Sequence, residues 1–277
     1  MRQAVGSTQA GMLELDFAQL SDTGRERDHN EDFLGYVQPE TAEEARSRGW
    51  ILALADGVGG QDAGEIASHA AVEHVLAGFR AARPGEPLTA LLPRLVRSAN
   101  QHVYELGRSS SPGGTSMAST FVACALRYDR AVVAHAGDSR CYLIRERQAA
   151  LLTRDHTLAN EQARMGLLSA KGAAGSSNSH ILSRSLGTDL FLNVDLSEHQ
   201  ILPDDVIVLC CDGLYHSVDG SEIAAVAGDG RELKAAARIL IALANERDGS
   251  DNISVQLARI RSVERVGMYR GRLYKIR

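Results

Sequence analysis

Runs of apolar residues divide this 277-residue chain into segments typical of strands and segments typical of helices. Short apolar runs bounded by turn residues predict strands. The predicted strands are Met12–Leu20, Phe33–Val37, Trp50–Ala55, Ser119–Leu126, Ala131–Ala136, Cys141–Ile144, Asp205–Cys210 and Asn252–Ile260. The short connections among the fourth, fifth and sixth of these strands indicate an antiparallel meander.

Longer segments carry apolar residues at the three- and four-residue spacing of one helix face. They predict helices at Asp62–Arg80, Leu88–Leu106, Gly220–Ala227 and Arg231–Ala244, and a short helix at Asn160–Met165. Two of the long helices come early in the chain and two come late. Strands in runs, with helices grouped before and after them, predict an α+β fold in which helices pack on the faces of sheets.

Composition excludes several classes of protein. The longest apolar run has six residues, as in Val206–Cys211, whereas a membrane-spanning helix needs roughly 20. Residues 1–11 contain no apolar stretch of the kind found in a signal peptide, and the four cysteines show no CxxC spacing. We therefore expect a cytoplasmic protein with no membrane partner, in which the cysteines are buried, reduced thiols.

Charge is distributed unevenly along the chain. The net charge is −5, but residues 261–277 alone carry +5, so the other 260 residues carry −10. An acidic body argues against nucleic acid as a partner, because phosphate contacts need a basic surface. The basic tail has two interpretations: solvated residues that close the fold, or a docked strand or contact for an acidic partner. The second is suggested by the apolar residues Met268, Tyr269, Leu273, Tyr274 and Ile276.

Acidic residues stand at the ends of several predicted strands. Asp56, Asp138 and Asp212 each follow an apolar run. Asp251 opens the last strand, and the pair 31–32 opens an early one. A single aspartate at such a place is usually a turn former. Five such sites weaken that interpretation, since strands pack side by side and their ends can converge.

A cluster of carboxylates would need cations or protons to be stable. Two unit charges ~4 Å apart repel by ~4 kcal/mol at an effective dielectric constant of ~20. Carboxylate oxygens and a glycine carbonyl suit the hard ions Mg²⁺ and Mn²⁺, and Gly57 has no side chain to keep its carbonyl from an ion. Two such ions that share an aspartate form a site for phosphoester hydrolysis.

Eight collinear segments, spread over nearly the whole chain, resemble those of the metal-dependent type-2C serine/threonine protein phosphatases of the bacterial type. The segments are Arg27–Asp32, Ala55–Gly60 with Gly64–Ser68, Gly114–Ser116, Ala136–Arg140, Thr153–His156, Leu182–Gly187, Cys210–Leu214 and Asp251–Val255. The resemblance implies two central antiparallel β-sheets sandwiched between helix pairs, with a small flap. We expect one catalytic domain over residues 1–260, a flap at about 157–181 and a basic extension at 261–277.

The resemblance also implies which acidic residues bind each metal ion. Asp56 is expected to bridge two ions, and the carbonyl of Gly57 to bind one of them. Asp212 and Asp251 are expected to bind the other ion. Asp138 matches the residue that reaches a third, weaker ion in bacterial members.

Glu31 and Asp32 are expected to hold metal-bound waters. Arg27 is expected to bind the substrate phosphate, for which a bidentate guanidinium fork is suited. Arg27, Asp56 and Asp212 are thus the expected catalytic residues. The implied mechanism is attack of a metal-bridging hydroxide on phosphorus, without a covalent phosphoenzyme.

The implied activity is hydrolysis of phosphoserine and phosphothreonine in proteins, with two or three Mn²⁺ or Mg²⁺ ions as cofactors. The expected partners are a phosphorylated protein and a serine/threonine kinase that the enzyme opposes, and we expect a monomer. A catalytically weak, phosphatase-like module that binds and regulates a partner is one alternative, and a phosphatase of small metabolites is another. Retention of the metal ligands favours catalysis, because a binding module needs no metal pair.

Three features depart from the family pattern. Gln61 stands where bacterial members commonly have histidine, so protonation of the leaving group would fall to a water molecule. His216 stands four residues after Asp212, where many members have aspartate or asparagine. This departure either removes the third ion or favours a softer one such as Mn²⁺. The glycine- and serine-rich segment Leu168–Ser179 lacks the flap signature, and we expect it to be mobile.

Overall fold

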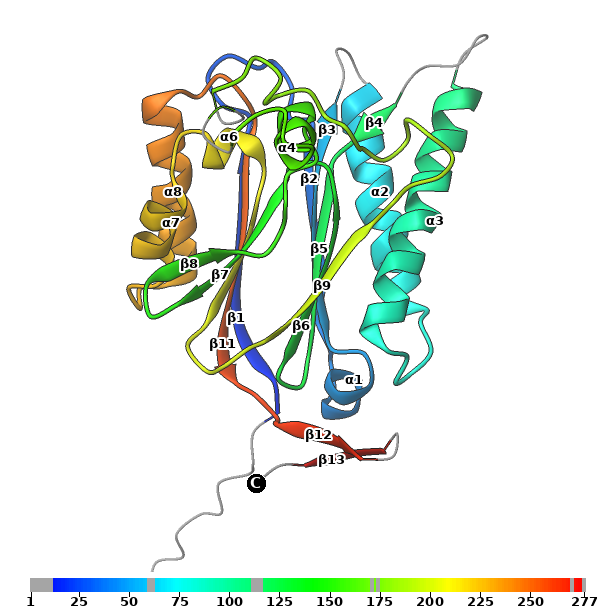
Figure 1. Ribbon diagram of the computed structural model, residues 1–277. Coiled ribbons are helices and arrows are strands. Elements are labelled where there is room, and N and C mark those ends of the chain that lie inside the picture. Colours follow the sequence, from blue (N-terminus) through cyan, green and yellow to red (C-terminus); the bar gives the residue numbers. More distant parts are fainter. Residues whose placement is uncertain are drawn as a thin grey trace, which may run out of the picture.

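The computed structural model describes residues 12–58, 63–110, 117–169, 172, 175–269 and 272–275. Two antiparallel sheets lie face to face in the centre of the molecule, and a pair of helices covers the outer face of each sheet (Figure 1). The layers therefore follow the order helix pair, sheet, sheet, helix pair. This confirms the α+β sandwich expected from the sequence.

The first sheet has the strand order β2-β3-β5-β6-β9, and β4 pairs with the end of β3. Its strands are β2 (Asp32–Val37), β3 (Trp50–Val58), β4 (Ala118–Ser119), β5 (Phe121–Arg127), β6 (Arg130–Ala136) and β9 (Asp195–Gln200). The helices on its outer face are α2 (Ala63–Arg80) and α3 (Leu88–Ser109) (Figure 1). A short helix, α1 (Ala42–Ser47), connects β2 to β3.

The second sheet has the strand order β1-β11-β10-β7-β8. Its strands are β1 (Glu14–Asp22), β7 (Arg140–Arg145), β8 (Gln148–Leu151), β10 (Val206–Cys210) and β11 (Ile253–Ser262). The outer helices are α7 (Gly220–Ala227) and α8 (Leu233–Arg247), and two short helices, α4 (Leu158–Arg164) and α6 (Asp212–Tyr215), lie at one end of the sandwich (Figure 1).

The apolar run of β3 is buried on both faces of its sheet. Ile51, Ala53 and Ala55 pack beneath α2 and α3, whereas Leu52 and Leu54 pack in the core between the sheets. Successive side chains of a strand point to opposite faces, so a continuous apolar run suits a strand covered on both sides. The same alternation directs the next even-numbered side chain, Asp56, toward the second sheet.

Most of the predicted elements are present with boundaries shifted by a few residues. The helix predicted at Gly220–Ala227 has the predicted bounds and begins with a capping box between Asp219 and Glu222. The strand predicted at Trp50–Ala55 continues to Val58, so Asp56 and Gly57 lie within β3 and not in the loop after it. The sequence did not predict α1, α6, β8 or β9, which are short or mostly polar.

The basic C-terminal segment folds back on itself. Its strands β12 (Val266–Tyr269) and β13 (Arg272–Lys275) form an antiparallel hairpin that pairs with neither large sheet among the described residues. The hairpin lies at the end of the sandwich opposite α4 and α6 (Figure 1). A hairpin within the tail was not among the structures that the sequence predicted for this segment.

The glycine- and serine-rich segment is only partly covered by the structure. Residues 170, 171, 173 and 174 of the predicted mobile segment lie outside the described residues. The two ends of the flap are held together, because Thr157 and Leu182 form an isolated antiparallel bridge. The mobility of the segment stays a prediction.

Candidate functional site

The acidic residues predicted from strand ends meet at one end of the sandwich. Asp32 on β2 pairs in register with Asp56 on β3, so both side chains lie on one face of the first sheet. That face is turned to the second sheet, where Asp212 follows β10 and Asp251 precedes β11. The charges of Asp32, Asp212, Asp138 and Asp251 all act on Asp56. The structure therefore brings together the carboxylates that the sequence placed at separate strand ends.

The backbone of Asp56 is fixed by the residues that join β4 to β5. Its carbonyl oxygen accepts hydrogen bonds from the Ser119 hydroxyl and from the Thr120 N–H, both at 2.8 Å. Its own N–H donates to the Thr120 hydroxyl at 3.1 Å. These three bonds involve only the backbone of Asp56, and its side chain meets the carboxyl group of Asp212. Sequence reasoning gave Ser119 and Thr120 no role, and their only signal was a polar pair beside an apolar strand.

Burial and mutual repulsion raise the pKa values of these carboxyl groups. Burial raises the pKa of Asp32 to about 7, and the charges of Asp212 and Asp251 act in the same direction. Burial likewise raises the pKa of Asp138 to about 7. The pKa of Asp56 is raised well above its usual value, first by burial and then by the neighbouring acids. Without cations, the cluster would be held partly protonated near neutral pH.

Two glycines create the space in which Glu31 meets this cluster. A Cβ atom on Gly57 would lie 2.3 Å from the carbonyl oxygen of Gly64, so β3 can approach the first turn of α2 because Gly57 lacks a side chain. A Cβ atom on Gly64 would lie 2.9 Å from the carboxylate carbon of Glu31. The N–H of Gly57 donates to the Glu31 carbonyl at 3.1 Å. The glycines therefore seat Glu31 directly over the end of β3.

Asn252 joins the loop that carries Arg27 and Glu31 to the start of β11. Its side-chain amide donates to the carbonyls of Thr23 and His29 at 2.9 Å, and its side-chain oxygen accepts from the Glu31 N–H at 2.8 Å. The side chain is only 5% exposed. Asn252 is thus a positioning residue that the sequence analysis left without a role, although its place beside Asp251 was a usable signal.

Arg27 lies at the open edge of the cluster. Its Nη2 atom is 3.0 Å from Oδ2 of Asp251, and its Nε atom contacts the carbonyl of Ser250 at 3.4 Å. Half of the Arg27 side chain is exposed to solvent. An exposed ion pair of this kind contributes little to stability, so the guanidinium remains available to an anion that approaches the carboxylates.

The donor set fits divalent cations. Both carboxylate oxygens of Asp32 are buried and have no hydrogen-bond partner of ordinary geometry among the described residues. Buried charged oxygens without a partner are costly unless cations offset them. All the donors predicted from the sequence are oxygens, which is the ligand type of Mg²⁺ and Mn²⁺. The arrangement can therefore hold the ion pair that the sequence analysis inferred.

Two residues expected near the site, Gln61 and His216, differ from the family pattern, and the structure describes only the second. Gln61 lies outside the described residues, so its predicted place beside the site stays a prediction. His216 lies with its Nδ1 atom 3.9 Å from Oδ2 of Asp212, and its ring centroid is 5.1 Å from that of His180 in the flap. Burial lowers the pKa of His216, which favours a neutral imidazole. The His216 side chain therefore faces the cluster.

A second group of polar residues lies behind Asp138 and has a structural role. The imidazole of His156 accepts a hydrogen bond from the Gly137 N–H at 3.2 Å, and its other nitrogen lies 3.2 Å from Asp195. Arg184 contacts both His156 and Asp195, at 3.3 and 2.8 Å. Both ring nitrogens of His156 are engaged and a guanidinium lies beside them, so this group joins the segments on either side of the flap to the first sheet and does not suit a cation.

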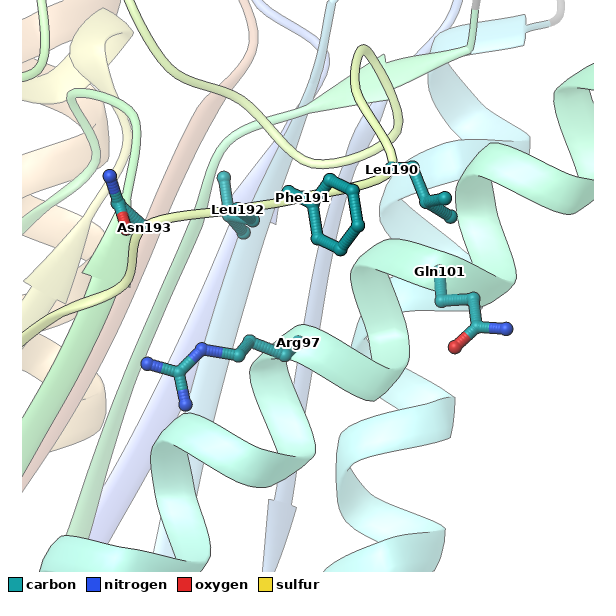
Figure 2. Close-up of a pocket in the computed structure, with 6 residues that line it drawn as sticks. All are labelled: Arg97, Gln101, Leu190, Phe191, Leu192 and Asn193. Carbon is teal, nitrogen blue, oxygen red and sulfur yellow. The ribbon is translucent and has the colours of Figure 1, made fainter.

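A surface groove lies between α3 and the segment before β9, and none of the clustered carboxylates lines it. Figure 2 shows Arg97 and Gln101 on the helix facing Leu190–Asn193 on the segment. Asn100 fixes this segment, because its amide donates to the carbonyls of Asp189 and Leu190 at 2.9 and 3.1 Å. Phe191 is consequently held 89% exposed on an anchored backbone.

The chain is similar to known proteins over most of its length. The family model described as protein phosphatase 2C matches residues 18–253. A putative protein phosphatase 2C-type of Streptococcus pyogenes is 33% identical over 243 residues, which is 86% of this chain and 94% of that protein. A serine/threonine phosphatase stp of Listeria innocua is 32% identical over 255 residues, covering 91% of this chain and 96% of that protein.

Solved structures show the same fold over most of the chain. A serine/threonine phosphatase of Streptococcus agalactiae superposes with a TM-score of 0.78 at 31% identity, covering 89% of this chain and all of that one. The catalytic domain of the serine/threonine phosphatase PstP in complex with two manganese ions gives a TM-score of 0.75 at 30% identity, covering 90% of this chain and all of that one. The chain therefore belongs to the protein phosphatase 2C family of metal-dependent serine/threonine phosphatases.

Proposed function

We propose that the carboxylate cluster is the catalytic centre, with Asp56 shared between two divalent ions. The carbonyl of Gly57 and the carboxylates of Asp212 and Asp251 complete the direct ligands. Glu31 and Asp32 would bind water molecules of the ions. The observation that carries this proposal is that buried acids from both sheets converge. Among the described residues, no guanidinium or ammonium group is buried between these acids.

The ions bound there would be Mn²⁺ or Mg²⁺, and their chemistry is to activate water and to offset negative charge on the phosphate. Asp138 would bind a third ion. The His216 imidazole beside Asp212 favours Mn²⁺ over Mg²⁺ at that third position, because imidazole suits ions softer than Mg²⁺.

Arg27 would orient the substrate phosphate. Its guanidinium already lies 3.0 Å from a carboxylate oxygen of the cluster, so a phosphate bound against the ions would come within its reach. A planar fork binds two phosphate oxygens at once, which fixes the direction of the bond that breaks. The Gln61 amide is not an acid, so the alkoxide leaving group would take its proton from a water molecule.

The proposed substrates are proteins that carry phosphoserine or phosphothreonine, and the enzyme would oppose a serine/threonine kinase. We propose a monomeric catalytic domain over residues 1–260, with the flap at about 157–181 beside the site and the basic hairpin as an extension. The proposed location is the cytoplasm. No helix among the described residues is long and apolar enough to cross a membrane.

The test is hydrolysis of a phosphothreonine peptide by the full chain with Mn²⁺, with EDTA, and by the Asp212→Ala variant. The account expects activity that requires the metal and falls to background in the variant. Small phosphorylated metabolites serve as the competing substrates. Faster turnover of a metabolite than of the peptide would contradict the proposed substrate class, and a folded, inactive protein would favour a binding module.

A further inference from the structure

One group at the catalytic cluster is not an oxygen donor. Cys211 follows β10 and precedes Asp212, and its side chain is fully buried. Its sulfur, one carboxylate oxygen of Asp32 and one carboxylate oxygen of Asp56 all lie within 4.8 Å of one another. The proposed ion pair gives this sulfur no role.

The three groups point into the same space from different elements. Asp32 and Asp56 come from paired positions of β2 and β3, and Cys211 comes from the second sheet. Both oxygens of Asp32 are buried without a hydrogen-bond partner of ordinary geometry among the described residues. Asp56 is half-buried and gives access from solvent. The Ser254 hydroxyl and the Cys211 thiol still lie close enough to act on the Asp32 carboxyl. The sulfur and this carboxylate are therefore neighbours that one cation could bind together.

The Cys211 thiol keeps its proton in the metal-free protein, because burial and the charges of Asp32 and Asp56 raise its pKa. The Ser254 N–H donates to the sulfur at 3.1 Å, and the thiol donates to the Asn252 carbonyl at 3.3 Å. A cation that binds the sulfur must displace the thiol proton, which removes the bond to the Asn252 carbonyl and the hydrogen-bonding contact of the thiol with Asp32. The neighbouring thiol of Cys210 packs in the other core, beneath α7 and α8. The chain therefore supplies a matched cysteine that does not reach the carboxylates.

We propose that Cys211, Asp32 and Asp56 form a site for a thiophilic divalent cation of the Zn²⁺ class. Zn²⁺ binds thiolate sulfur at ~2.3 Å and carboxylate oxygen at ~2.0–2.2 Å, so side chains with these donor separations can close on one ion. The cation forms a bond to sulfur and the thiol proton leaves to solvent. Mg²⁺ and Mn²⁺ favour oxygen ligands, so sulfur gives this site a different preference from the all-oxygen positions.

Occupancy of this site would inhibit the enzyme, because the cation takes a carboxylate oxygen of Asp56 from the catalytic ions. This part of the inference rests on the proposed function, whereas the binding itself does not. Two experiments separate the parts. Cobalt binding is measured by absorbance on metal-free protein, and inhibition is measured on protein loaded with Mn²⁺.

In the first experiment, the full chain is titrated with Co²⁺ while the near-ultraviolet thiolate-to-cobalt charge-transfer band is recorded. The expected result is a band in the wild-type protein and in Cys210→Ala, and none in Cys211→Ser. Circular dichroism checks that each variant is folded, and Cys211→Ala replaces the serine variant if that one is not. A band that persists without Cys211, or no band in the wild type, would overturn the site.

In the second experiment, Zn²⁺ is added to the Mn²⁺-loaded enzyme during hydrolysis of a phosphothreonine peptide. Mutation of even an outer-shell partner of a metal ligand typically weakens metal affinity by 10–100-fold. Loss of the sulfur ligand itself should therefore make Cys211→Ser need at least about tenfold more Zn²⁺ for half inhibition than Cys210→Ala. Equal inhibition of the two variants would overturn the inhibitory role. An inactive wild-type enzyme with a cobalt band would instead contradict the proposed function and leave the site standing.

Discussion

Asp32 on β2 and Asp56 on β3 are directly paired residues of the sheet, so their two acidic side chains lie on the same buried face. Burial raises the pKa of both groups, and the charge of Asp32 raises that of Asp56 further. Two carboxyl groups so placed cannot both ionise at low cost unless cations lie beside them. The charge state of the site therefore depends on pH and on divalent ions.

The metal-free protein is expected to lose a contribution to its stability as the pH rises. The pKa of Asp32 is about 7 in the folded protein, against 3.8 as the ordinary value. Between these values the folded state binds more protons than the unfolded state, so the contribution of Asp32 to the free energy of unfolding decreases with rising pH. The measurement is the melting temperature of EDTA-treated protein across this range, compared with Asp32→Asn.

The Asp32→Asn variant should show a shallower decline over the same pH range, because it lacks the titrating group. Added Mn²⁺ should raise the melting temperature of the wild type more at the upper end of the range than at the lower end. A variant whose pH profile matches the wild type would show that Asp32 does not titrate as described.

Gly57→Ala is expected to weaken metal binding and stability together. The added Cβ would lie 2.3 Å from the Gly64 carbonyl, a backbone atom that cannot rotate away. Overpacking of this kind costs about 1–3 kcal/mol. Gly220→Ala is the control, since the nearest atom to a Cβ at that position is 3.4 Å away. Urea unfolding and Mn²⁺ titration of both variants test this, and equal behaviour of the two would contradict the tight approach of β3 to α2.

Asn252→Ala is expected to reduce activity through the position of its neighbours. The side chain makes three hydrogen bonds to the loop that carries Arg27 and Glu31. Removing a buried hydrogen-bonding group costs about 1–3 kcal/mol and would loosen that loop. The measurement is kcat/KM for a phosphothreonine peptide together with urea unfolding. Asn245→Ala, which loses the single bond of its amide to Asp22, is the control and should keep kcat/KM near the wild-type value.

Arg27→Lys is expected to raise KM even though it keeps the positive charge. A lysine ammonium lacks the planar fork that binds two phosphate oxygens. Loss of one hydrogen bond to a charged group costs about 1.5–3 kcal/mol, which corresponds to a fall in kcat/KM of roughly tenfold or more. Arg97→Lys, in the surface groove beside Phe191, is the matched control. If the two substitutions have the same effect on steady-state kinetics, Arg27 does not contact the phosphate.

The sequence was sufficient for those parts of the site that depend on strand ends. Acids at strand ends were expected to converge, and Asp56, Asp212 and Asp251 do lie together, although Asp56 lies within β3 and Asp251 precedes β11. Their division between the two ions was implied by the family resemblance. The position of the Asn252 side chain and the contact between Gly57 and Gly64 could not be predicted from the sequence. Both depend on segments far apart in the chain, and no local pattern records which backbone atoms will meet.

The same reasoning explains the elements that were missed. Strand β9 has the sequence Asp-Leu-Ser-Glu-His-Gln, which contains one strongly apolar residue, and it forms because β6 offers it an open edge. Helix α6 has only four residues and is stabilised by its position between β10 and the cluster. In both cases tertiary contact outweighs weak local preference.

The central claim is that Asp56 is shared by two ions, and counting bound metal tests it most directly. Metal-free protein is titrated with Mn²⁺, and the free ion is followed by electron paramagnetic resonance. The account predicts at least two ions per chain for the wild type and for Asp16→Asn, an exposed control. It predicts the loss of both for Asp56→Asn and retention of one for Asp251→Asn. An Asp56→Asn protein that binds as many ions as the wild type would contradict the account.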